Sequence, residues 1–291
     1  RPRRGRSYQQ GSAHKTTILP YGRSRNSMRL PCPWPTQAIP PAYLAPMPVR
    51  AKKHLGQHFL KEDAIAQRIA ASLSGHGGWT HLIEVGPGTG ALTRHLIARG
   101  DDLTCFEVDR ESVAHLATAH PDLRVLQDDF LRADLSRIAK GALAVIGNFP
   151  YNISTQIVFK VLEHRDRVTE VVGMFQKEVA DRICAGPGSR TYGITSVLAQ
   201  AWYTCEPLFI VEPGSFIPPP KVRSAVIRMR RNAIEKLDCD ERLLFQVVKA
   251  AFNQRRKTLG NALKAFAPLR SDVPERFTKL RAEQLLGAVD G

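Results

Sequence analysis

The sequence lacks a long apolar run, since no uninterrupted stretch approaches the 18 residues that a membrane-spanning helix requires. It also has little cysteine. Its five cysteines are odd in number and never occur in Cys-x-x-Cys spacing, which excludes the usual zinc motifs and a disulfide framework. We therefore expect no metal site, reduced thiols and a cytoplasmic location. The cysteines are Cys32, Cys105, Cys184, Cys205 and Cys239.

Acidic residues are absent from residues 1–50, which hold nine Lys or Arg and nine of the twenty prolines. This segment shows neither a helical nor a strand period, and we interpret it as a disordered, basic extension. Its composition also fits an organellar transit peptide, although the prolines leave no amphipathic helix. An upstream extension of the gene model, with the start at Met28 or Met47, is the favoured interpretation.

The charged residues are also unevenly distributed over residues 51–291. Residues 51–220 hold 17 basic and 19 acidic side chains, whereas residues 221–291 hold 16 basic and eight acidic ones. We predict a catalytic domain over residues 51–232 and a small, basic, all-helical domain over residues 233–291. A near-neutral body suits a small-molecule site, and a basic lobe suits a phosphate-rich partner. The alternative is that the basic side chains only form a solvated surface.

A glycine-rich turn follows the first predicted strand of the body. Residues 82–85 are expected to form the strand, Gly86-Pro87-Gly88-Thr89-Gly90 the turn, and residues 91–99 a helix, which is the first unit of a doubly wound α/β sheet. The spacing is not Gly-x-Gly-x-x-Gly, and no phosphate-binding lysine follows. The turn therefore favours S-adenosylmethionine over a dinucleotide, with an ordinary helix-entry turn as the alternative.

Two acidic side chains follow the next two predicted strands. Glu107 ends the strand at 103–108, where an ionised carboxylate can accept both ribose hydroxyls, and Asp109 fits a helix cap. Asp129 follows the strand at 123–126 and can accept from an adenine amine, with Phe130 or its backbone N–H at the ring edge. Asp129 can equally cap its own turn.

The fourth strand, at 143–147, leads into Asn148-Phe149-Pro150-Tyr151. Pro150 restricts its own backbone and that of Phe149, which holds the Asn148 amide and the Tyr151 ring in place. Asn148 and the following carbonyls can accept from an amine while Tyr151 stacks on the ring that bears it. A common Pro turn is the alternative. Because parallel strands end at one sheet edge, all four strand ends are expected to meet there.

The second half of the body has weaker signals. Strands are predicted at 169–175, 203–211 and 225–229, helices at 155–162 and 193–201, and a mobile loop at 185–192. In the proline-rich loop 214–222, Phe216 is expected either to stack on a ligand or to face the core. Helices are predicted at 241–252, at 255–265 and near 281–286, with three consecutive cations at 255–257.

Five motifs, taken in order, resemble those of the bacterial small-subunit ribosomal RNA adenine dimethyltransferases (the KsgA/RsmA family). The resemblance covers about residues 51–291 and leaves out residues 1–50. The matching segments are Lys53-His54-Leu55-Gly56-Gln57-His58-Phe59-Leu60, Glu84-Val85-Gly86-Pro87-Gly88-Thr89-Gly90, Gly147-Asn148-Phe149-Pro150-Tyr151-Asn152-Ile153-Ser154, Phe216-Ile217-Pro218-Pro219-Pro220-Lys221-Val222 and Phe252-Asn253-Gln254-Arg255-Arg256-Lys257-Thr258-Leu259.

The resemblance implies a Rossmann-like class I S-adenosylmethionine-dependent methyltransferase that acts as a monomer, without metal, on 16S rRNA of the small ribosomal subunit. It implies dimethylation of two adjacent adenosines in the 3′-terminal hairpin. The implied cofactor-binding residues are His58, Leu60, Gly86, Gly88, Glu107, Asp129, Phe130 and Asn148. The implied catalytic residues are Asn148, Pro150, Tyr151 and Phe216, and the implied RNA-binding residues are Lys221, Arg255, Arg256 and Lys257.

Two departures from the family pattern stand at the site. His58 occupies a position where the family often has Asn, and Phe149 one where Leu or Ile is usual, so its bulk is expected to narrow the pocket slightly. The alternatives are a large-subunit rRNA methyltransferase of the resistance type and a DNA adenine methyltransferase. A mitochondrial rRNA dimethyltransferase is a further alternative. A ribosome-assembly or mitochondrial transcription factor that keeps the fold only as a binding module is an alternative of a different class.

Overall fold

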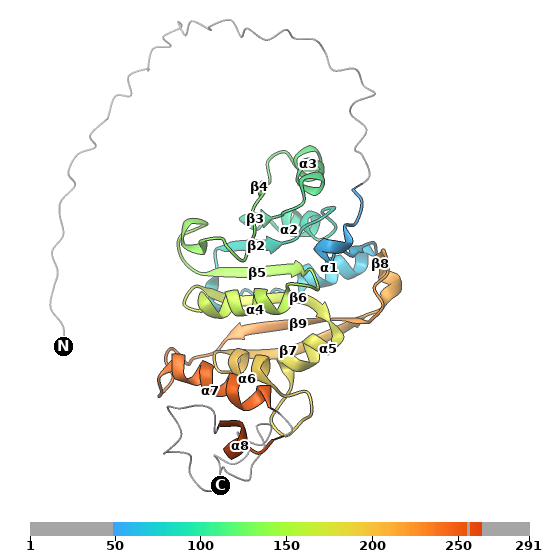
Figure 1. Ribbon diagram of the computed structural model, residues 1–291. Coiled ribbons are helices and arrows are strands. Elements are labelled where there is room, and N and C mark those ends of the chain that lie inside the picture. Colours follow the sequence, from blue (N-terminus) through green and yellow to red (C-terminus); the bar gives the residue numbers. More distant parts are fainter. Residues whose placement is uncertain (1–48, 255–256, 264–291) are drawn as a thin grey trace, which may run out of the picture. The chain divides into compact units, whose positions relative to one another are not determined.

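The computed structural model of the chain describes residues 49–254 and 257–263. Its centre is a seven-stranded sheet in the order β4-β3-β2-β5-β6-β9-β7 (Figure 1). All neighbouring strands from β4 to β6 run parallel, and β9 is antiparallel to both β6 and β7. The strands are β2 (His81–Val85), β3 (Leu103–Phe106), β4 (Arg124–Leu126), β5 (Leu143–Asn148), β6 (Val168–Gln176), β7 (Tyr203–Val211) and β9 (Ser224–Arg231).

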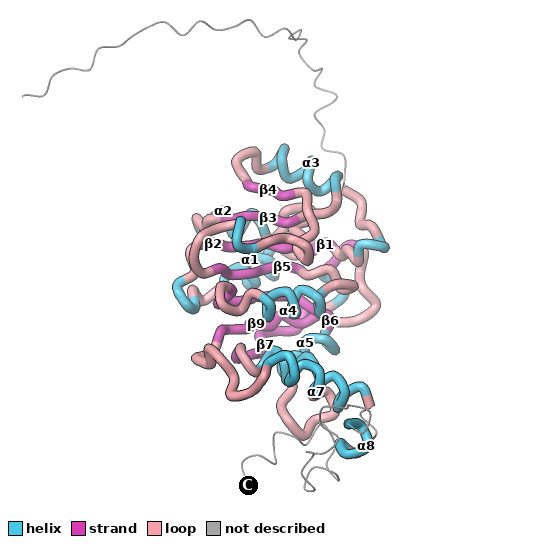
Figure 2. The backbone as a smooth tube through the Cα atoms, turned by 60° about the vertical axis from the view of Figure 1, so that its left-hand side comes forward, coloured by secondary structure: helices cyan, strands magenta, loops and turns pink. Residues whose placement is uncertain are grey.

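Helices cover both faces of this sheet, because successive strand residues point to opposite sides and both sides are apolar. In β5, Val145 belongs to one buried cluster and Ile146 to the other. The first cluster includes residues of α4 (Ser154–Glu163), α5 (Lys177–Cys184), α6 (Ile194–Gln200), α7 (Glu241–Asn253) and α8 (Leu259–Leu263). The second includes residues of α1 (Asp63–Ala71) and α2 (Thr93–Arg99), and α3 (Arg110–Ala119) lies beside β4 (Figure 2).

A second, two-stranded sheet joins distant parts of the chain. β1 (Phe59–Leu60) pairs antiparallel with β8 (Phe216–Ile217), with Phe59 opposite Ile217. The short 3₁₀ helix η2 (Lys53–Leu55) precedes β1. This pairing brings the segment before the first main strand against the proline-rich loop. The sequence contains no local signal for it, because each strand is only two residues long.

The predicted doubly wound α/β sheet and most predicted elements are confirmed, and two differences appear besides the β1–β8 pairing. Residues 177–184 form α5, a helix that the sequence reading missed. The helix predicted from residue 255 begins at Leu259, because Lys257 and Thr258 are not helical. The predicted helix near 281–286 and nearly all of the 1–50 extension lie outside the described residues.

The described part of the C-terminal segment shares the core of the body. Val248, Ala251 and Phe252 of α7 belong to the same buried cluster as β5 and β6. The loop predicted as mobile ends in Tyr192, which is 1% exposed and packs edge-on against Phe252 with ring centroids 5.9 Å apart. The boundary at residue 232 stays a prediction, and the described helices beyond it do not form a separate core.

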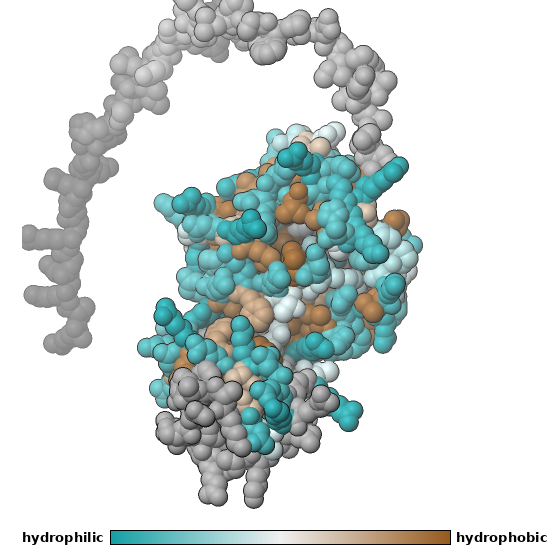
Figure 3. Space-filling model, viewed as in Figure 1, coloured by the Kyte–Doolittle hydropathy of each residue, from teal (hydrophilic) through white to brown (hydrophobic). Residues whose placement is uncertain are grey.

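The surface of the described part is mostly polar on the face seen in Figure 3, where apolar residues gather toward the middle of the view. Within residues 49–254 and 257–263, no helix combines the length and apolar character needed to cross a membrane.

Candidate active site

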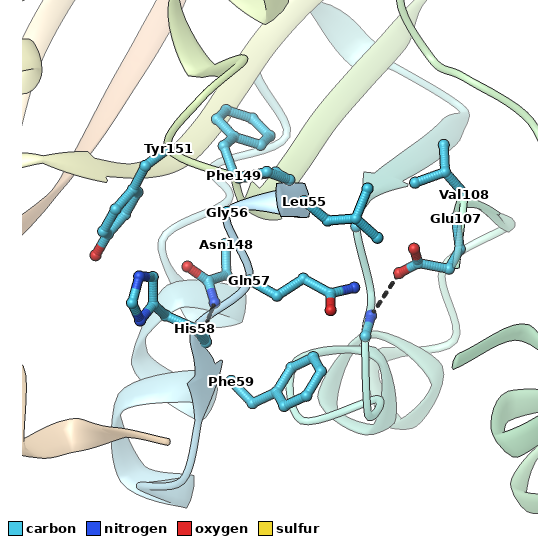
Figure 4. Close-up of a pocket in the computed structure, with 13 residues that line it drawn as sticks. Leu55, Gly56, Gln57, His58, Phe59, Glu107, Val108, Asn148, Phe149 and Tyr151 are labelled. Carbon is cyan, nitrogen blue, oxygen red and sulfur yellow. Dashed lines mark hydrogen bonds between the residues drawn. The ribbon is translucent and has the colours of Figure 1, made fainter. Parts of the chain in front are cut away.

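A cavity of about 40 Å³ lies at the carboxyl ends of β2, β3 and β5, beneath the segment that leads into β1 (Figure 4). Eight of its lining residues are ones that the sequence singled out: His58, Gly86, Gly88, Glu107, Asn148, Phe149, Pro150 and Tyr151. The structure therefore brings three of the four predicted strand ends together at one place.

The glycine turn requires glycine at two of the lining positions. Gly86 and Gly88 both have positive φ values, 70° and 57°, where L side chains are strained. A Cβ on Gly88 would also lie 2.8 Å from the ring of Phe59, and one on Gly86 would lie 3.5 Å from Pro150. The turn thus leaves its backbone exposed to a ligand on the cavity side, which a side chain at either position would obstruct.

Glu107 is a buried carboxylate whose two oxygens each accept a backbone hydrogen bond. Oε2 accepts from Gly88 N at 3.0 Å and Oε1 from Asp109 N at 2.9 Å, and the residue is 4% exposed. Burial raises the pKa of Glu107, while these backbone donors act in the opposite direction. The two bonds orient the carboxylate into the cavity and leave each oxygen one further lone pair for a hydroxyl donor.

Below the glycine turn lies a second acid, Glu84, which is 1% exposed within β2. Burial raises its pKa to about 7, and the nearby Glu107 charge adds to this rise. Cys105 donates to Glu84 Oε2 at 3.5 Å. Glu84 does not line the cavity, and its charge is coupled to that of Glu107, which does.

The amide of Asn148 has one orientation that satisfies its surroundings. Its Nδ2 donates to the backbone carbonyl of His58 at 2.8 Å, and a carbonyl can only accept. The other end of the amide, Oδ1, is therefore an acceptor for a group in the cavity. An amine with two N–H bonds is a suitable partner for it.

Pro150 and Tyr151, the last two residues of this tetrapeptide, also line the cavity. The Pro150 carbonyl already accepts from Ile153 N at 3.1 Å, so one lone pair remains for a ligand. The Tyr151 hydroxyl lies 2.5 Å from Ser224 Oγ, which holds the ring, and burial raises the pKa of this phenol. Tyr151 is thereby a fixed, neutral aromatic surface at the cavity.

Phe149 turns its ring away into the core. It is 1% exposed and packs edge-on against Phe175 at 5.2 Å. Space for the ring comes from Gly147 and Gly173, which are register partners on β5 and β6. A Cβ on Gly173 would lie 2.3 Å from the Phe149 ring. Gly147 and Gly173 thus leave room for the ring in the core, but Phe149 also lines the cavity, so its expected narrowing of the pocket stays a prediction.

The His58 side chain lies on the Tyr151 side of the cavity. Its ring centroid is 5.2 Å from that of Tyr151, with a 30° angle between the planes, and its Nδ1 is 2.7 Å from the Pro218 carbonyl. Because a carbonyl can only accept, Nδ1 carries the proton in this contact. His58 thus joins the proline-rich loop to the wall that Tyr151 forms.

Four predicted site residues do not line this cavity. Leu60 and Phe216 are 7% and 2% exposed and belong to the buried cluster between the sheet and α1. The burial of Phe216 agrees with the core-facing alternative, and a stacking role for its ring stays a prediction. Phe130 is 2% exposed, with its ring edge-on to Phe106 at 5.6 Å, which leaves only its backbone for a ligand.

Asp129 is the fourth of the predicted cofactor-binding or catalytic residues that do not line the cavity. Its Oδ1 accepts from Leu131 N at 3.0 Å, so this carboxylate caps its own turn. Its other oxygen, Oδ2, lies 3.7 Å from Nε of the exposed Arg132. The side chain is 37% exposed, and its contact with adenine stays a prediction.

Among the predicted RNA-binding residues, Lys221 and Lys257 are exposed. The backbone N–H of Lys257 donates to Gln254 O at 2.8 Å, which places it in a turn between α7 and α8. Arg255 and Arg256 lie outside the described residues. Contact of any of these cations with RNA stays a prediction.

Sequence reasoning gave no role to five of the lining residues: Leu55, Gly56, Gln57, Phe59 and Val108. Four of them lie within the first motif, so the motif itself was a signal, although only packing shows which side chains face the cavity. Val108 is 48% exposed, an unusual position for an apolar side chain, and follows the ribose-acceptor candidate Glu107 directly.

The family model for ribosomal RNA adenine dimethylases matches residues 49–285. The chain belongs to this family. The predicted fold class and enzyme class are thereby confirmed, and the protein is an S-adenosylmethionine-dependent rRNA adenine methyltransferase.

Curated relatives agree with this family membership. Ribosomal RNA small subunit methyltransferase A of Parabacteroides distasonis is 54% identical over 242 residues, which are 81% of this chain and 90% of the relative. The protein of the same name from Cytophaga hutchinsonii is 51% identical over 240 residues, covering 81% and 93% of the two chains.

Solved structures give the same fold. A dimethyladenosine transferase from Plasmodium falciparum superposes with a TM-score of 0.65 at 22% identity, covering 78% of this chain and 92% of that one. The 23S rRNA methyltransferase ErmE superposes with a TM-score of 0.57 at 26% identity, covering 78% and 96%.

The residues of the cavity fit the cofactor of this family. The glycine turn at 86–90 allows close approach to the backbone, and Glu107 offers a buried carboxylate to a diol. Val108 offers an apolar surface beside that carboxylate. Among residues 49–254 and 257–263, no group of three or more His, Cys, Asp or Glu side chains is arranged to hold a metal ion.

Proposed function

We propose that this protein is a cytoplasmic monomer that dimethylates N6 of two adjacent adenosines in the 3′-terminal hairpin of small-subunit (16S) rRNA. The names of its curated relatives specify the small ribosomal subunit, and they span nearly the whole described body. The observation that carries the adenine chemistry is the Asn148 amide, whose Nδ2 is engaged by the His58 carbonyl.

The role of Asn148 follows from the chemistry of the adenine amine. Its nitrogen is a poor nucleophile because its lone pair is delocalised into the ring. Oδ1 of Asn148 and the remaining lone pair of the Pro150 carbonyl can accept from the two N–H bonds, which favours a pyramidal, more nucleophilic nitrogen. When bound, S-adenosylmethionine supplies an electrophilic methyl group on its sulfonium.

Holding the amine in line with that methyl group is the main contribution of the chain. Glu107 and the glycine turn would hold the ribose and the backbone-facing part of the cofactor. No covalent enzyme intermediate is required. The second methylation needs an acceptor arrangement that still admits a monomethylated amine, which one N–H bond to Asn148 allows.

Tyr151 is the proposed stacking surface for the target base. Its ring is fixed by the contact of its hydroxyl with Ser224 and by the neighbouring His58 ring. Taking a base out of its helix costs a few kcal/mol, and stacking returns about 1–3 kcal/mol per base. Tyr151 lines the cavity, whereas Phe216 is buried in the core, so we assign the stacking contact to Tyr151 and leave a contact of Phe216 with the base as a prediction.

The test is methyl transfer from labelled S-adenosylmethionine to immature small subunits, followed by mapping of the modified bases. We expect two adjacent dimethyladenosines near the 3′ end of the small-subunit rRNA. Methylation of large-subunit rRNA or of DNA instead would overturn the assigned target.

The assigned role of Asn148 has its own test. Asn148→Ala removes one preorganised polar contact and is expected to lower the turnover by about 10²–10³-fold. A folded Asn148→Ala variant with near-normal turnover would show that the amide does not hold the reacting amine. Asn261→Ala is a suitable control, since Asn261 is exposed on α8 and does not line the cavity.

A further inference from the structure

Lys52 makes a charged contact across the cofactor side of the site. Its Nζ pairs with Asp109 Oδ1, and it also lies 3.1 Å from Glu111 Oε1. The two acids differ in environment, because the Asp109 side chain is 1% exposed and that of Glu111 is 51% exposed. The contact joins the start of the N-terminal covering segment to the start of α3.

Asp109 connects this contact to the proposed ribose acceptor. Its backbone N–H donates to Glu107 Oε1 at 2.9 Å, while its side chain receives Lys52 and the hydroxyl of Ser112. Asp109 also caps α3 by accepting from Glu111 N. One residue therefore orients the Glu107 carboxylate with its backbone and anchors Lys52 with its side chain.

Lys52 begins the segment that covers the cavity. Its backbone N–H donates to Gln57 Oε1 at 2.9 Å, and its carbonyl accepts from Leu55 N at 3.0 Å. Leu55, Gly56 and Gln57 all line the cavity. The far end of the segment is held by the pairing of β1 with β8. Lys52 is thus the charged anchor at one end of a covering segment that is held at both ends.

The residues that line the cavity bear on how the segment works. Leu55, Gly56 and Gln57 of the segment line it together with Gly88 and Glu107. A cofactor held by Glu107 and the glycine turn would therefore contact this segment, and outward movement of the segment would open its path out of the site. The β1–β8 pairing consists of backbone hydrogen bonds, while the Lys52 end depends on side chains and can release without unpairing a strand.

We infer that Lys52 is a positioning residue that latches residues 52–57 over S-adenosylmethionine through Asp109 and Glu111, and so sets how fast the cofactor leaves. The inference rests on the proposed cofactor site at Glu107 and the glycine turn. Lys52 touches neither the reacting atoms nor the cavity, and acts through Asp109 and Gln57.

Lys52 and Asp109 carry opposite charges at neutral pH. The hydrogen bond to Asp109 raises the pKa of Lys52, so the ammonium stays charged. Burial alone would raise the pKa of Asp109, but its bonds to Lys52 and Ser112 outweigh this effect and lower the pKa overall. Both groups are therefore ionised at neutral pH. Salt weakens the attraction between them, because Lys52 is partly exposed to solvent.

The experiment is a stopped-flow displacement of a fluorescent S-adenosylhomocysteine analogue by excess S-adenosylhomocysteine from the full-length protein. Lys52→Met keeps the aliphatic length and removes the charge, and we expect it to raise the dissociation rate constant about three- to tenfold. Asp109→Asn should act similarly, since asparagine also caps helices. The double variant should lose little more than either single one, because both remove the same interaction.

Lys53→Met is the matched control, because Lys53 is adjacent, exposed and without an ion pair in the described part of the chain. Its dissociation rate should stay within about twofold of the wild type. The difference between Lys52→Met and the wild type should also shrink as sodium chloride rises from about 0.05 to 0.5 M, since salt screens the pair. A purely structural role would lower the melting temperature without this salt dependence.

Two results would overturn the inference. One is an equal dissociation rate for Lys52→Met and Lys53→Met, and the other is full additivity of Lys52→Met with Asp109→Asn. Either would leave the proposed function intact as long as the wild type binds S-adenosylhomocysteine. A wild type that binds no S-adenosylhomocysteine in calorimetry would overturn the cofactor site and the latch together.

Discussion

Replacing Glu107 with glutamine probes the site more sharply than truncating it. The substitution keeps the shape of the side chain and changes one oxygen into an NH₂ group. In the structure both oxygens accept from backbone N–H groups, of Gly88 and Asp109. The glutamine amide can accept from only one of these two N–H groups, because its NH₂ end is itself a donor and cannot accept from the other.

The magnitude follows from these contacts. A hydrogen bond to a charged group is worth about 1.5–3 kcal/mol, and a buried donor left without a partner costs about 1–3 kcal/mol. We therefore expect Glu107→Gln to weaken cofactor binding by about 1.5–3 kcal/mol, which is roughly 10- to 150-fold in the dissociation constant. Glu107→Ala should lose a similar amount of affinity, because it removes the same acceptor.

The assay is isothermal titration calorimetry with S-adenosylhomocysteine, with a thermal melt of each variant to establish that it folds. Asp122→Asn is a suitable control, because Asp122 is exposed and outside the cavity. A folded Glu107→Gln variant with a dissociation constant within twofold of the wild type would refute the reasoning, since the carboxylate would then contribute no charge-assisted contact.

Three further predictions concern the core, pH and RNA. Gly173→Ala should lower the free energy of unfolding by about 1–3 kcal/mol, because the added Cβ would overlap the Phe149 ring; an unchanged denaturation midpoint would contradict the packing described. The pKa of Glu84 is raised from an ordinary 4.5 to about 7. Between these two pH values the folded protein keeps a proton that the unfolded chain has lost, so the free energy of unfolding falls as the pH rises from about 4.5 to about 7. The stability of Glu84→Gln relative to the wild type should therefore rise by up to about 3 kcal/mol between pH 5 and pH 8 in urea titrations, and a pH-independent difference would exclude the buried carboxyl as the cause. Neutralising the three cations at 255–257 together should weaken RNA binding and reduce its salt dependence without changing cofactor affinity, and an unaltered salt slope would show that these cations do not bind phosphate.

Much of the site could be predicted because the fold places strand ends together. Gly86, Glu107 and Asn148 are far apart in the chain, but each lies at the carboxyl end of a strand in the parallel part of the sheet. Apolar runs mark the strands, and the parallel arrangement then puts their carboxyl ends at one edge. Knowing the strands was therefore enough to group these three residues.

Phe216 shows where that reasoning could not decide between two positions for a ring. An aromatic residue in a stiff proline loop has the same sequence pattern whether its ring faces a ligand or the core. The pairing of β8 with β1 places Phe216 in the buried cluster beneath α1. Helix α5 was missed for a related reason, because its eight residues directly follow a long strand without a separating turn.

The sequence alone determined the α/β class, the strand ends and the chemical nature of the groups at them, since periodicity and residue type are local properties. Tertiary structure alone decided which groups touch. His58 reaches Pro218, Lys52 reaches Asp109, and Gly173 makes room for Phe149. Such contacts depend on how distant segments pack, and no local pattern of residues encodes that.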